Sequence, residues 1–529
     1  MEISNCILNA AETVNGSNGF NSYHANTKVR LWNNIIYGND LGTGITGNSA
    51  AEAIAYNNTI YNCNIGLSGA GVTLAKNNLV QSCVDGYSGA FNAESNYNIS
   101  DIALDAPGAN SKQATVVFKD AANGDFRLAP NDVEAYNAGT DLSADATIPF
   151  STDILGNKRV ATLWDIGANE KTRVIYYSVG TSVANLNTNG ATVTVTGGYT
   201  ATFSAVLPDN IGVGDKLTYG GNTAYIYKRN SGTVYLIQSA TGGAATNIGA
   251  GTACTINRTF NTLSSAEDGA DDASYLNTAD LQANNIQLHF TCYADGTLSK
   301  VTIDGYTTAK DNYIRIYAPN LSSEVGASQR HDGVWNSNYV NVLLTASSNW
   351  QNLFYIMDDY VRIEGLQLAA SNAGAYLWPK SLSSNDISSI YNAIYISDCI
   401  IKSSSSTEMT NSIYIQDGDE NAFVYNNVIY DFNNSSGSRF NIINNAKAYV
   451  YNNTFFNCYY GMYNSGTGYS VIKNNLIQNC TDGYYGTFDT GSNYNISDLA
   501  GDAPGVNSIN SKVINFVDKD NKDFHLSGL

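Results

Sequence analysis

Three acidic residues in one short stretch are the first candidates for binding a metal ion. Asp417, Asp419 and Glu420 lie almost side by side in the sequence. Carboxylate oxygens are the hard ligands that Ca²⁺ prefers. A solvated acidic loop explains the same run, and both interpretations stay open here. The sequence therefore predicts no obligatory cofactor and leaves Ca²⁺ as an ion that these three residues are able to hold.

A second group has the residue types needed for acid–base catalysis. Asp358 and Asp359 come shortly before Arg362 and Glu364, and two carboxyl groups in unequal surroundings can serve as an acid and a base. His331, between an arginine and an aspartate, has the most reactive neighbours of the four histidines. Consecutive residues point in different directions, however, and a polar loop explains both patterns. The sequence assigns no catalytic residue.

Four of the eight cysteines recur at one position of a repeated pattern. Cys63, Cys83, Cys458 and Cys480 each follow an Asn-Asn pair at the same distance. Equal spacing predicts that these thiols stack from one repeat to the next. Side chains on adjacent parallel strands project side by side, which favours free buried thiols, although a disulfide is within reach. No Cys-x-x-Cys pair occurs, which disfavours a zinc or thioredoxin-like centre.

The composition indicates which elements must position these residues. The 529 residues include 47 Gly, 37 Tyr and only 7 Pro, and many Val, Ile and Thr, which favour strands, while Asn and Gly favour turns. With 46 acidic and 27 basic residues the formal charge is −19, so the chain does not neutralise phosphates and nucleic acid is not expected as a partner. No apolar run approaches the roughly 18 residues of a membrane span.

One long passage occurs twice in the chain. Lys76–Ser111 returns as Lys473–Ser508 with most residues unchanged. The chain therefore contains two tandem copies of one module. A long module of this kind suits a repeat-built unit better than a single compact core.

A shorter period lies within each copy, marked by an Asn-Asn pair followed by apolar residues. Successive pairs are about 20 to 26 residues apart, a spacing typical of a parallel β-solenoid. Equivalent residues of neighbouring coils form vertical ladders about 4.8 Å apart, so a turn asparagine can donate its amide to the next coil. We assign this structural ladder to the first asparagine of each pair: Asn33, Asn57, Asn77, Asn426, Asn452 and Asn474.

These patterns predict an all-β chain of solenoid segments in tandem with a small antiparallel β domain between them. Leu263–Leu281 is the best candidate for a helix that caps an open solenoid end. The expected division is as follows: residues 1–128, the C-terminal part of a first β-helix; 129–173, a terminal or linker region; 174–261, the antiparallel domain; 262–286, the capping helix region; 287–529, a second β-helix.

The region after the first solenoid carries four short motifs in order. They are Asp125–Leu128, Asn137–Asp141, Asp153–Arg159 and Trp164–Glu170. This order resembles the anchor-type terminal region of bacterial surface and secreted proteins with right-handed parallel β-helix repeats of the pectin-lyase-like kind. The resemblance implies a right-handed β-helix and an extracellular or cell-surface location.

Two classes of function remain. The leading hypothesis is a non-enzymatic structural repeat protein, an element of a fibre, stalk or adhesin that associates head to tail through its solenoid ends. The alternative is a carbohydrate-binding adhesin, or a polysaccharide lyase or glycoside hydrolase on a β-helix scaffold. No Gly-His-Gly of the polygalacturonase kind occurs. An exposed aromatic row would indicate a glycan ligand.

Overall fold

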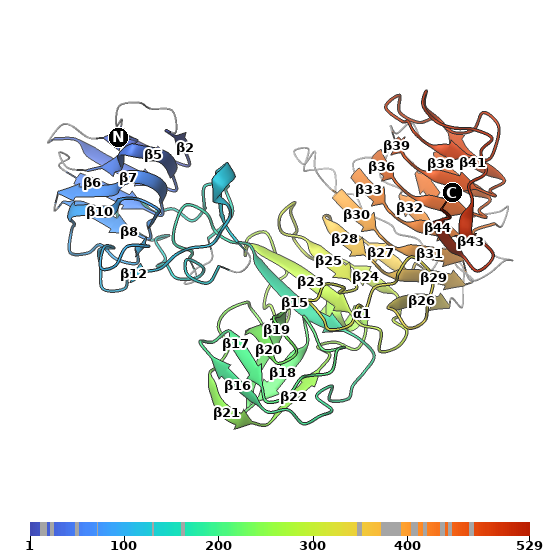
Figure 1. Ribbon diagram of the computed structural model, residues 1–529, viewed down its shortest axis with the longest axis horizontal. Helices are drawn as coiled ribbons and strands as arrows, with labels where there is room; N and C mark the ends of the chain where they lie inside the picture. Colours follow the sequence, from blue (N-terminus) through green and yellow to red (C-terminus); the bar gives the residue numbers. More distant parts are fainter. Residues whose placement is uncertain are drawn as a thin grey trace. The chain divides into compact units, whose positions relative to one another are not determined.

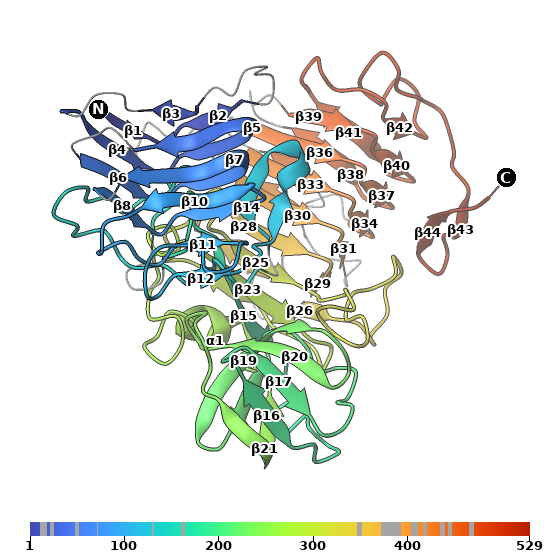
Figure 2. The ribbon, with the colours of Figure 1, turned by 60° about the vertical axis from the view of Figure 1, so that its left-hand side comes forward.

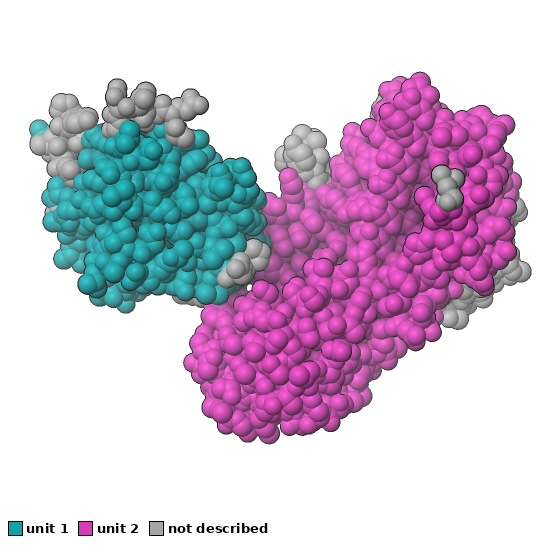
Figure 3. Space-filling model, viewed as in Figure 1, with its two compact units in different colours: residues 1–172, 282–285 teal, residues 173–281, 286–529 magenta. Residues whose placement is uncertain are grey.

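The computed structural model forms two compact units, Met1–Thr172 with Gln282–Asn285 and Arg173–Leu281 with Ile286–Leu529 (Figure 3). Each unit is described by itself. The chain is all-β, with parallel sheets in both units and one antiparallel sheet. The residues described are 1–10, 18–21, 26–47, 52–70, 72–129, 132–159, 164–345, 352–371, 393–403, 411–415, 421–433, 440–442, 447–464 and 470–528.

Unit 1 is a parallel β-solenoid, because each strand pairs with a strand one coil away instead of with its sequence neighbour (Figures 1 and 2). One sheet has the order β1 (Glu2–Ser4), β4 (Lys28–Trp32), β6 (Glu52–Tyr56), β8 (Thr73–Lys76). The other has the order β12 (Lys112–Gln113), β11 (Ile99–Ser100), β9 (Leu79–Gln81), β7 (Thr59–Ala70), β5 (Ile35–Thr46), β2 (Ile7–Asn9), with β10 (Asp85–Ala90) on β7 and β3 (Phe20–Asn21) on β5.

Unit 2 contains a longer solenoid with three main parallel sheets (Figure 1). The first is β15 (Arg173–Val179), β23 (Ile286–Cys292), β25 (Ile314–Tyr317), β28 (Val361–Glu364), β30 (Ala393–Ser397), β33 (Asn421–Tyr425), β36 (Lys447–Tyr451), β39 (Val471–Lys473). The second is β26 (Asn341–Thr345), β29 (Gln367–Ser371), β31 (Ile400–Ser403), β34 (Val428–Tyr430), β37 (Thr454–Phe456), β40 (Leu476–Gln478), β42 (Ile496–Ser497). The third is β32 (Ile413–Ile415), β35 (Phe440–Ile442), β38 (Tyr460–Asn464), β41 (Asp482–Gly486), and β24 (Val301–Ile303) pairs with β27 (Phe354–Ile356).

The antiparallel domain is an insertion between the first two strands of this solenoid, because β15 pairs in parallel with β23. Its sheet has the order β21 (Ile248–Thr252), β16 (Val193–Thr196), β17 (Thr200–Phe203), β20 (Val234–Gln238), β19 (Asn222–Arg229), β18 (Lys216–Tyr219), β22 (Cys254–Asn257). The helix α1 (Leu263–Gly269) follows, with Thr262 and Ser265 forming a capping box. It is shorter than the sequence suggests, and it ends at a glycine.

Each solenoid copy carries the same small hairpin against its flank. In unit 1 the hairpin is β13 (Phe118–Asp120), the 3-10 helix η1 (Ala121–Asn123) and β14 (Asp125–Leu128). In unit 2 it is β43 (Phe516–Asp518) with β44 (Asp523–Leu526). Phe126 and Phe524 are buried at equivalent places. The duplication seen in the sequence therefore extends to this flanking element.

The interior is an apolar column, because strand residues that point inward repeat from coil to coil. One row of unit 2 lies in register across seven strands, and all its members are buried: Phe290, Ile316, Ile363, Ile396, Val424, Val450 and Ile472. Burial of such rows is the main favourable term in the stability of the fold.

At one corner of each solenoid this column is joined by a ladder of buried asparagines. Each side-chain amide donates to the Oδ1 of the equivalent asparagine in the next coil, at 3.0 to 3.1 Å, and that oxygen also accepts a backbone N–H. The residues are Asn34, Asn58, Asn78 and Asn98 in unit 1, and Asn427, Asn453, Asn475 and Asn495 in unit 2. The continuous ladder thus lies at the second asparagine of each pair, while among the predicted first asparagines Asn77 Nδ2 donates to Asn57 Oδ1 at 3.0 Å.

We expect Asn453→Ala to lower the free energy of unfolding by about 2–4 kcal/mol, because buried partners lose their hydrogen bonds. Asn453 donates to Asn475 and to the Val424 carbonyl, and it accepts from Asn427. Asn452→Gly is the matched control: Asn452 is exposed and has a positive φ that glycine tolerates. Urea unfolding followed by circular dichroism measures both variants. Equal losses in the two variants would contradict a structural role for the ladder.

Candidate functional site

The first asparagine of each pair forms the corner of the coil. Its φ lies between 48° and 58° at all six predicted positions, Asn33, Asn57, Asn77, Asn426, Asn452 and Asn474. Asparagine tolerates this left-handed conformation better than most residues. The corner turns these six side chains away from the core ladder, which explains why the ladder falls to the next residue.

The two units treat these corner asparagines differently. In unit 1 they are buried under a segment within residues 132–171: the amide of Asn57 donates to the carbonyls of Asp165 (3.0 Å) and Gly167 (3.1 Å), and that of Asn77 to Thr140 (2.8 Å). In unit 2 the equivalent residues are exposed. In unit 1 the residues that follow the hairpin therefore cover this surface position.

Side chains within the covering segment of unit 1 hold it to the solenoid. Trp164 is fully buried and packs with Tyr56 and Leu142. Arg159 and Glu170 form a buried ion pair at 2.9 Å. Each charge is satisfied inside the protein, so these residues fasten the segment to the solenoid.

The repeated thiols stack as free cysteines. The backbone N–H of Cys63 donates to Sγ of Cys83 at 3.4 Å, and that of Cys458 donates to Sγ of Cys480 at 3.4 Å. The neighbouring Cys63 thiol, followed by burial, raises the pKa of Cys83. Burial, followed by Cys458, raises the pKa of Cys480. Both thiols are neutral packing groups and poor nucleophiles.

No group of three or more His, Cys, Asp or Glu side chains that could hold a metal ion occurs among the described residues. Asp417, Asp419 and Glu420, the Ca²⁺ candidates, lie outside the residues that the structure describes. Within the same described part of the chain, no helix has the length and apolar character needed to cross a membrane.

The carboxyl group of Asp358 binds main-chain groups. It accepts the backbone N–H groups of Gly305 and Tyr306, both at 2.9 Å. Glu267, on α1, accepts the N–H of Asp304 at 3.0 Å from the other side of the same loop. Burial raises the pKa of Glu267 to about 7. These carboxyl groups hold a loop between the helix and the solenoid.

The structure separates the other predicted members of that site. Burial, followed by the charge of Asp358, raises the pKa of Asp359 to about 6. Arg362 lies 3.6 Å over the ring of Tyr313, and Glu364 pairs with Arg315 at 2.8 Å. Within the described part of the chain, neither Arg362 nor Glu364 forms a hydrogen bond or an ion pair with Asp358 or Asp359. The geometry therefore does not assemble an acid and a base on one substrate.

His331 is part of a packed loop. Burial, followed by the charge of Arg330, lowers the pKa of His331 to about 4. Its Nδ1 accepts the N–H of Gly333 at 3.2 Å, while Arg330 pairs with Asp398 at 3.1 Å.

A row of polar and aromatic side chains on the outer face of the first sheet of unit 2 escaped the sequence analysis. Its members share one register position: Tyr176, His289, Arg315, Arg362, Tyr395, Phe423 and Tyr449. By residue type, a neutral histidine beside two guanidinium groups is able to bind a carboxylate and accept a proton. His289 is only 4% exposed, however, and burial lowers its pKa well below the usual value. Only the strand register, which the sequence does not state, brings these residues together.

The aromatic end of this row is a stack. The rings of Tyr395 and Phe423 lie 4.8 Å apart at 10°, and those of Phe423 and Tyr449 lie 4.9 Å apart at 8°. Each ring covers the face of the next, so the row presents mainly ring edges. Sugars stack on ring faces, so this row is a poor platform for a glycan.

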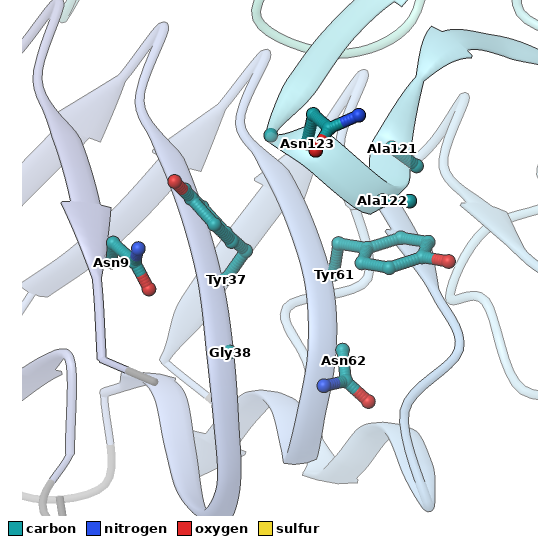
Figure 4. Close-up of a pocket in the computed structure, with 9 residues that line it drawn as sticks. Asn9, Tyr37, Gly38, Tyr61, Asn62, Ala121, Ala122 and Asn123 are labelled. Carbon is teal, nitrogen blue, oxygen red and sulfur yellow. The ribbon is translucent and has the colours of Figure 1, made fainter. Parts of the chain in front are cut away.

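A surface pocket of about 440 Å³ lies on unit 1 (Figure 4). Tyr37 and Tyr61 come from neighbouring strands, and η1 faces them from the hairpin. Nine residues of the described part of the chain line the pocket, and none of these nine is charged: Asn9, Tyr37, Gly38, Tyr61, Asn62, Ala121, Ala122, Asn123 and Gly124. No sequence motif marked it.

Comparisons with protein-family models, with curated proteins and with solved structures found no match. The geometry of unit 1 offers one candidate site for a small molecule, the pocket between the strands and the hairpin.

We expect the carboxyl group of Glu267 to make stability depend on pH. Its pKa is raised from 4.5 to about 7, so between these pH values the folded chain binds more protons than the unfolded chain. The stability that Glu267 contributes therefore falls as the pH rises through this range. Glu267→Gln should therefore raise the melting temperature at pH 8 and leave it nearly unchanged at pH 4.5. Asp268→Asn, an exposed neighbour, is the control. Scanning calorimetry that gave equal shifts at both pH values would contradict this assignment.

Proposed function

We propose that the chain is a structural repeat element of an extracellular or cell-surface fibre, stalk or adhesin, and that it associates with further copies of itself. The observation that carries the proposal is the duplication of one solenoid module, because both units repeat the asparagine ladder and the flanking hairpin. The extracellular location follows from the motif resemblance alone.

The residues beside Asn57 show how the covered face of unit 1 binds its segment. The hydroxyl of Tyr56 donates to Asp145 at 3.3 Å, and Lys76 lies 3.9 Å from the same carboxylate. Thr59 Oγ1 accepts the N–H of Ala168 at 2.9 Å. These are polar contacts from three neighbouring positions to one peptide segment.

The same face of unit 2 keeps the same residue types. Tyr451, Thr454 and Lys473 stand at the positions of Tyr56, Thr59 and Lys76, as the strand registers show, and all three are half-buried. The matching donors and acceptors favour a polypeptide segment as occupant. We therefore take a backbone segment of a further copy as the partner that binds there.

A carbohydrate-cleaving activity has less support. The paired carboxyl groups bind a loop, and the basic residues of the outer row already have partners. Binding of a carbohydrate without cleavage is a separate matter, because it needs only a pocket with suitable hydrogen-bonding groups.

We expect the purified full chain to form regular filaments or higher oligomers, seen by negative-stain electron microscopy and light scattering after size exclusion. The double variant Asn452→Asp, Asn474→Asp should be monomeric, because a carboxylate cannot donate to a backbone carbonyl. Asn110→Asp with Asn230→Asp adds the same charge at exposed positions away from this face and should still assemble. Discrete monomers of the unaltered chain at every concentration would refute self-association.

A further inference from the structure

The pocket of unit 1 is bounded by two glycines where side chains would otherwise fill it. Gly38 and Gly124 have φ values of 75° and 79°, and both line the pocket. A Cβ added to Gly124 would lie 2.9 Å from the hydroxyl oxygen of Tyr37. A larger side chain at this position would therefore project toward the two tyrosines (Figure 4).

The same place in unit 2 is occupied. Asp431 and Lys522 both have a φ of 65°, and Lys522 Nζ lies 2.8 Å from Asp431 Oδ1. The ammonium is also 5.6 Å from the ring centre of Tyr430 and 5.8 Å from that of Phe456. Non-glycine residues at positive φ are strained, and the ion pair offsets that strain.

Strand pairing shows that the strands lining the pocket of unit 1 are equivalent to the strands at the same place in unit 2. In unit 1, Tyr37 pairs with Tyr61, which pairs with Gln81. In unit 2, the matching row is Tyr430, Phe456 and Gln478. Both glutamine side chains accept a backbone N–H at 2.7 Å, from Val116 and Ile514 respectively.

The hairpins are equivalent as well. Asn123 donates from its backbone and its side chain to Asp120, at 3.3 and 2.7 Å. Asn521 does the same to Asp518, at 3.1 and 2.7 Å. The residue that follows each asparagine is Gly124 in one copy and Lys522 in the other. Six of the nine lining positions differ between the copies, and five of the six bring a charged residue in unit 2: Lys402, Asp431, Phe456, Lys519, Asp520 and Lys522 replace Asn9, Gly38, Tyr61, Ala121, Ala122 and Gly124.

We propose that the pocket of unit 1 is a binding site for a small neutral saccharide. Asn9, Asn62 and Asn123 place side-chain amides in its wall, and the amide of Asn123 is held in position by its bond to Asp120. Tyr37 and Tyr61 supply aromatic surface and hydroxyl groups. Hydroxyl-rich rings need this mixture of amide and aromatic contacts.

The absence of charge in the lining argues against ionic ligands. An anion would need a cation, and no lining residue carries one. A cation would need the carboxylate that Asp431 supplies in unit 2, and Gly38 removes it in unit 1. The volume, about 440 Å³, falls within the range of about 300–1,000 Å³ typical of small-molecule sites.

The two tyrosines are held in place without a ligand. Phe126 packs against both, at 4.9 Å from Tyr37 and 5.1 Å from Tyr61. Both tyrosines remain half-buried, so part of each side chain is available to the pocket. Such a site needs little rearrangement to bind, which favours affinity.

Saturation-transfer NMR on the full chain tests the proposal, with glucose, galactose, mannose and N-acetylglucosamine as probes and N-acetyl-lysine amide as the cationic comparison. The variant Gly38→Asp, Gly124→Lys copies unit 2 at these two positions and should close the pocket. We expect at least one saccharide to bind the unaltered chain and to bind this variant at least tenfold more weakly. Because unit 2 already carries both residues in the same conformation, the variant should fold, which circular dichroism verifies.

The control is Asp431→Gly with Lys522→Gly, which alters unit 2 alone and should leave the unit 1 signal in place. Binding of the lysine amide alone, no saccharide binding at all, or saccharide binding that survives closure of the pocket would each overturn the proposal. Binding is read from the ligand and assembly from particle size, so failure of one proposal leaves the other standing.

Discussion

The hydrogen bond from one buried asparagine amide to the next is the constraint on which both solenoids depend. Each Nδ2 and each Oδ1 of the ladder finds its partner one coil away, as between Asn58 and Asn78. An unpaired amide at such a buried position would cost free energy. Coils must therefore stack in one register. That register aligns the remaining strand residues in rows that face either the core or the outer surface.

The sequence allowed the duplication, the coil period and the antiparallel insertion to be predicted, because each repeats a pattern along the chain. The sequence did not show which asparagine of a pair forms the ladder, because both members are the same residue type and recur at the same spacing. The corner conformation of Asn57 decides this, and it becomes visible only in the backbone. The row through His289 and Arg315 was missed because their spacing along the chain differs from coil to coil, and only strand pairing aligns them.

The candidate pocket was beyond prediction for a different reason. Glycine at positions 38 and 124 is unremarkable in a glycine-rich chain, and its meaning appears only beside Asp431 and Lys522. The equivalence of these positions rests on strand register and on hairpin contacts made by residues that both copies keep, such as Asn123 and Asn521. A pocket becomes visible only once strands and hairpin are placed together.

Duplication makes the surface of such a molecule interpretable, because the ladder and the core hold the backbone constant while outer positions change. A difference between equivalent outer residues is then a difference in surface chemistry alone. At this place unit 2 holds two non-glycine residues at positive φ and the ion pair between them. The pocket of unit 1 has glycines there and is lined by three amides and two aromatic rings. Because water must leave those groups when a ligand arrives, only a ligand that replaces its hydrogen bonds, as a hydroxylated ring does, can bind there with net gain.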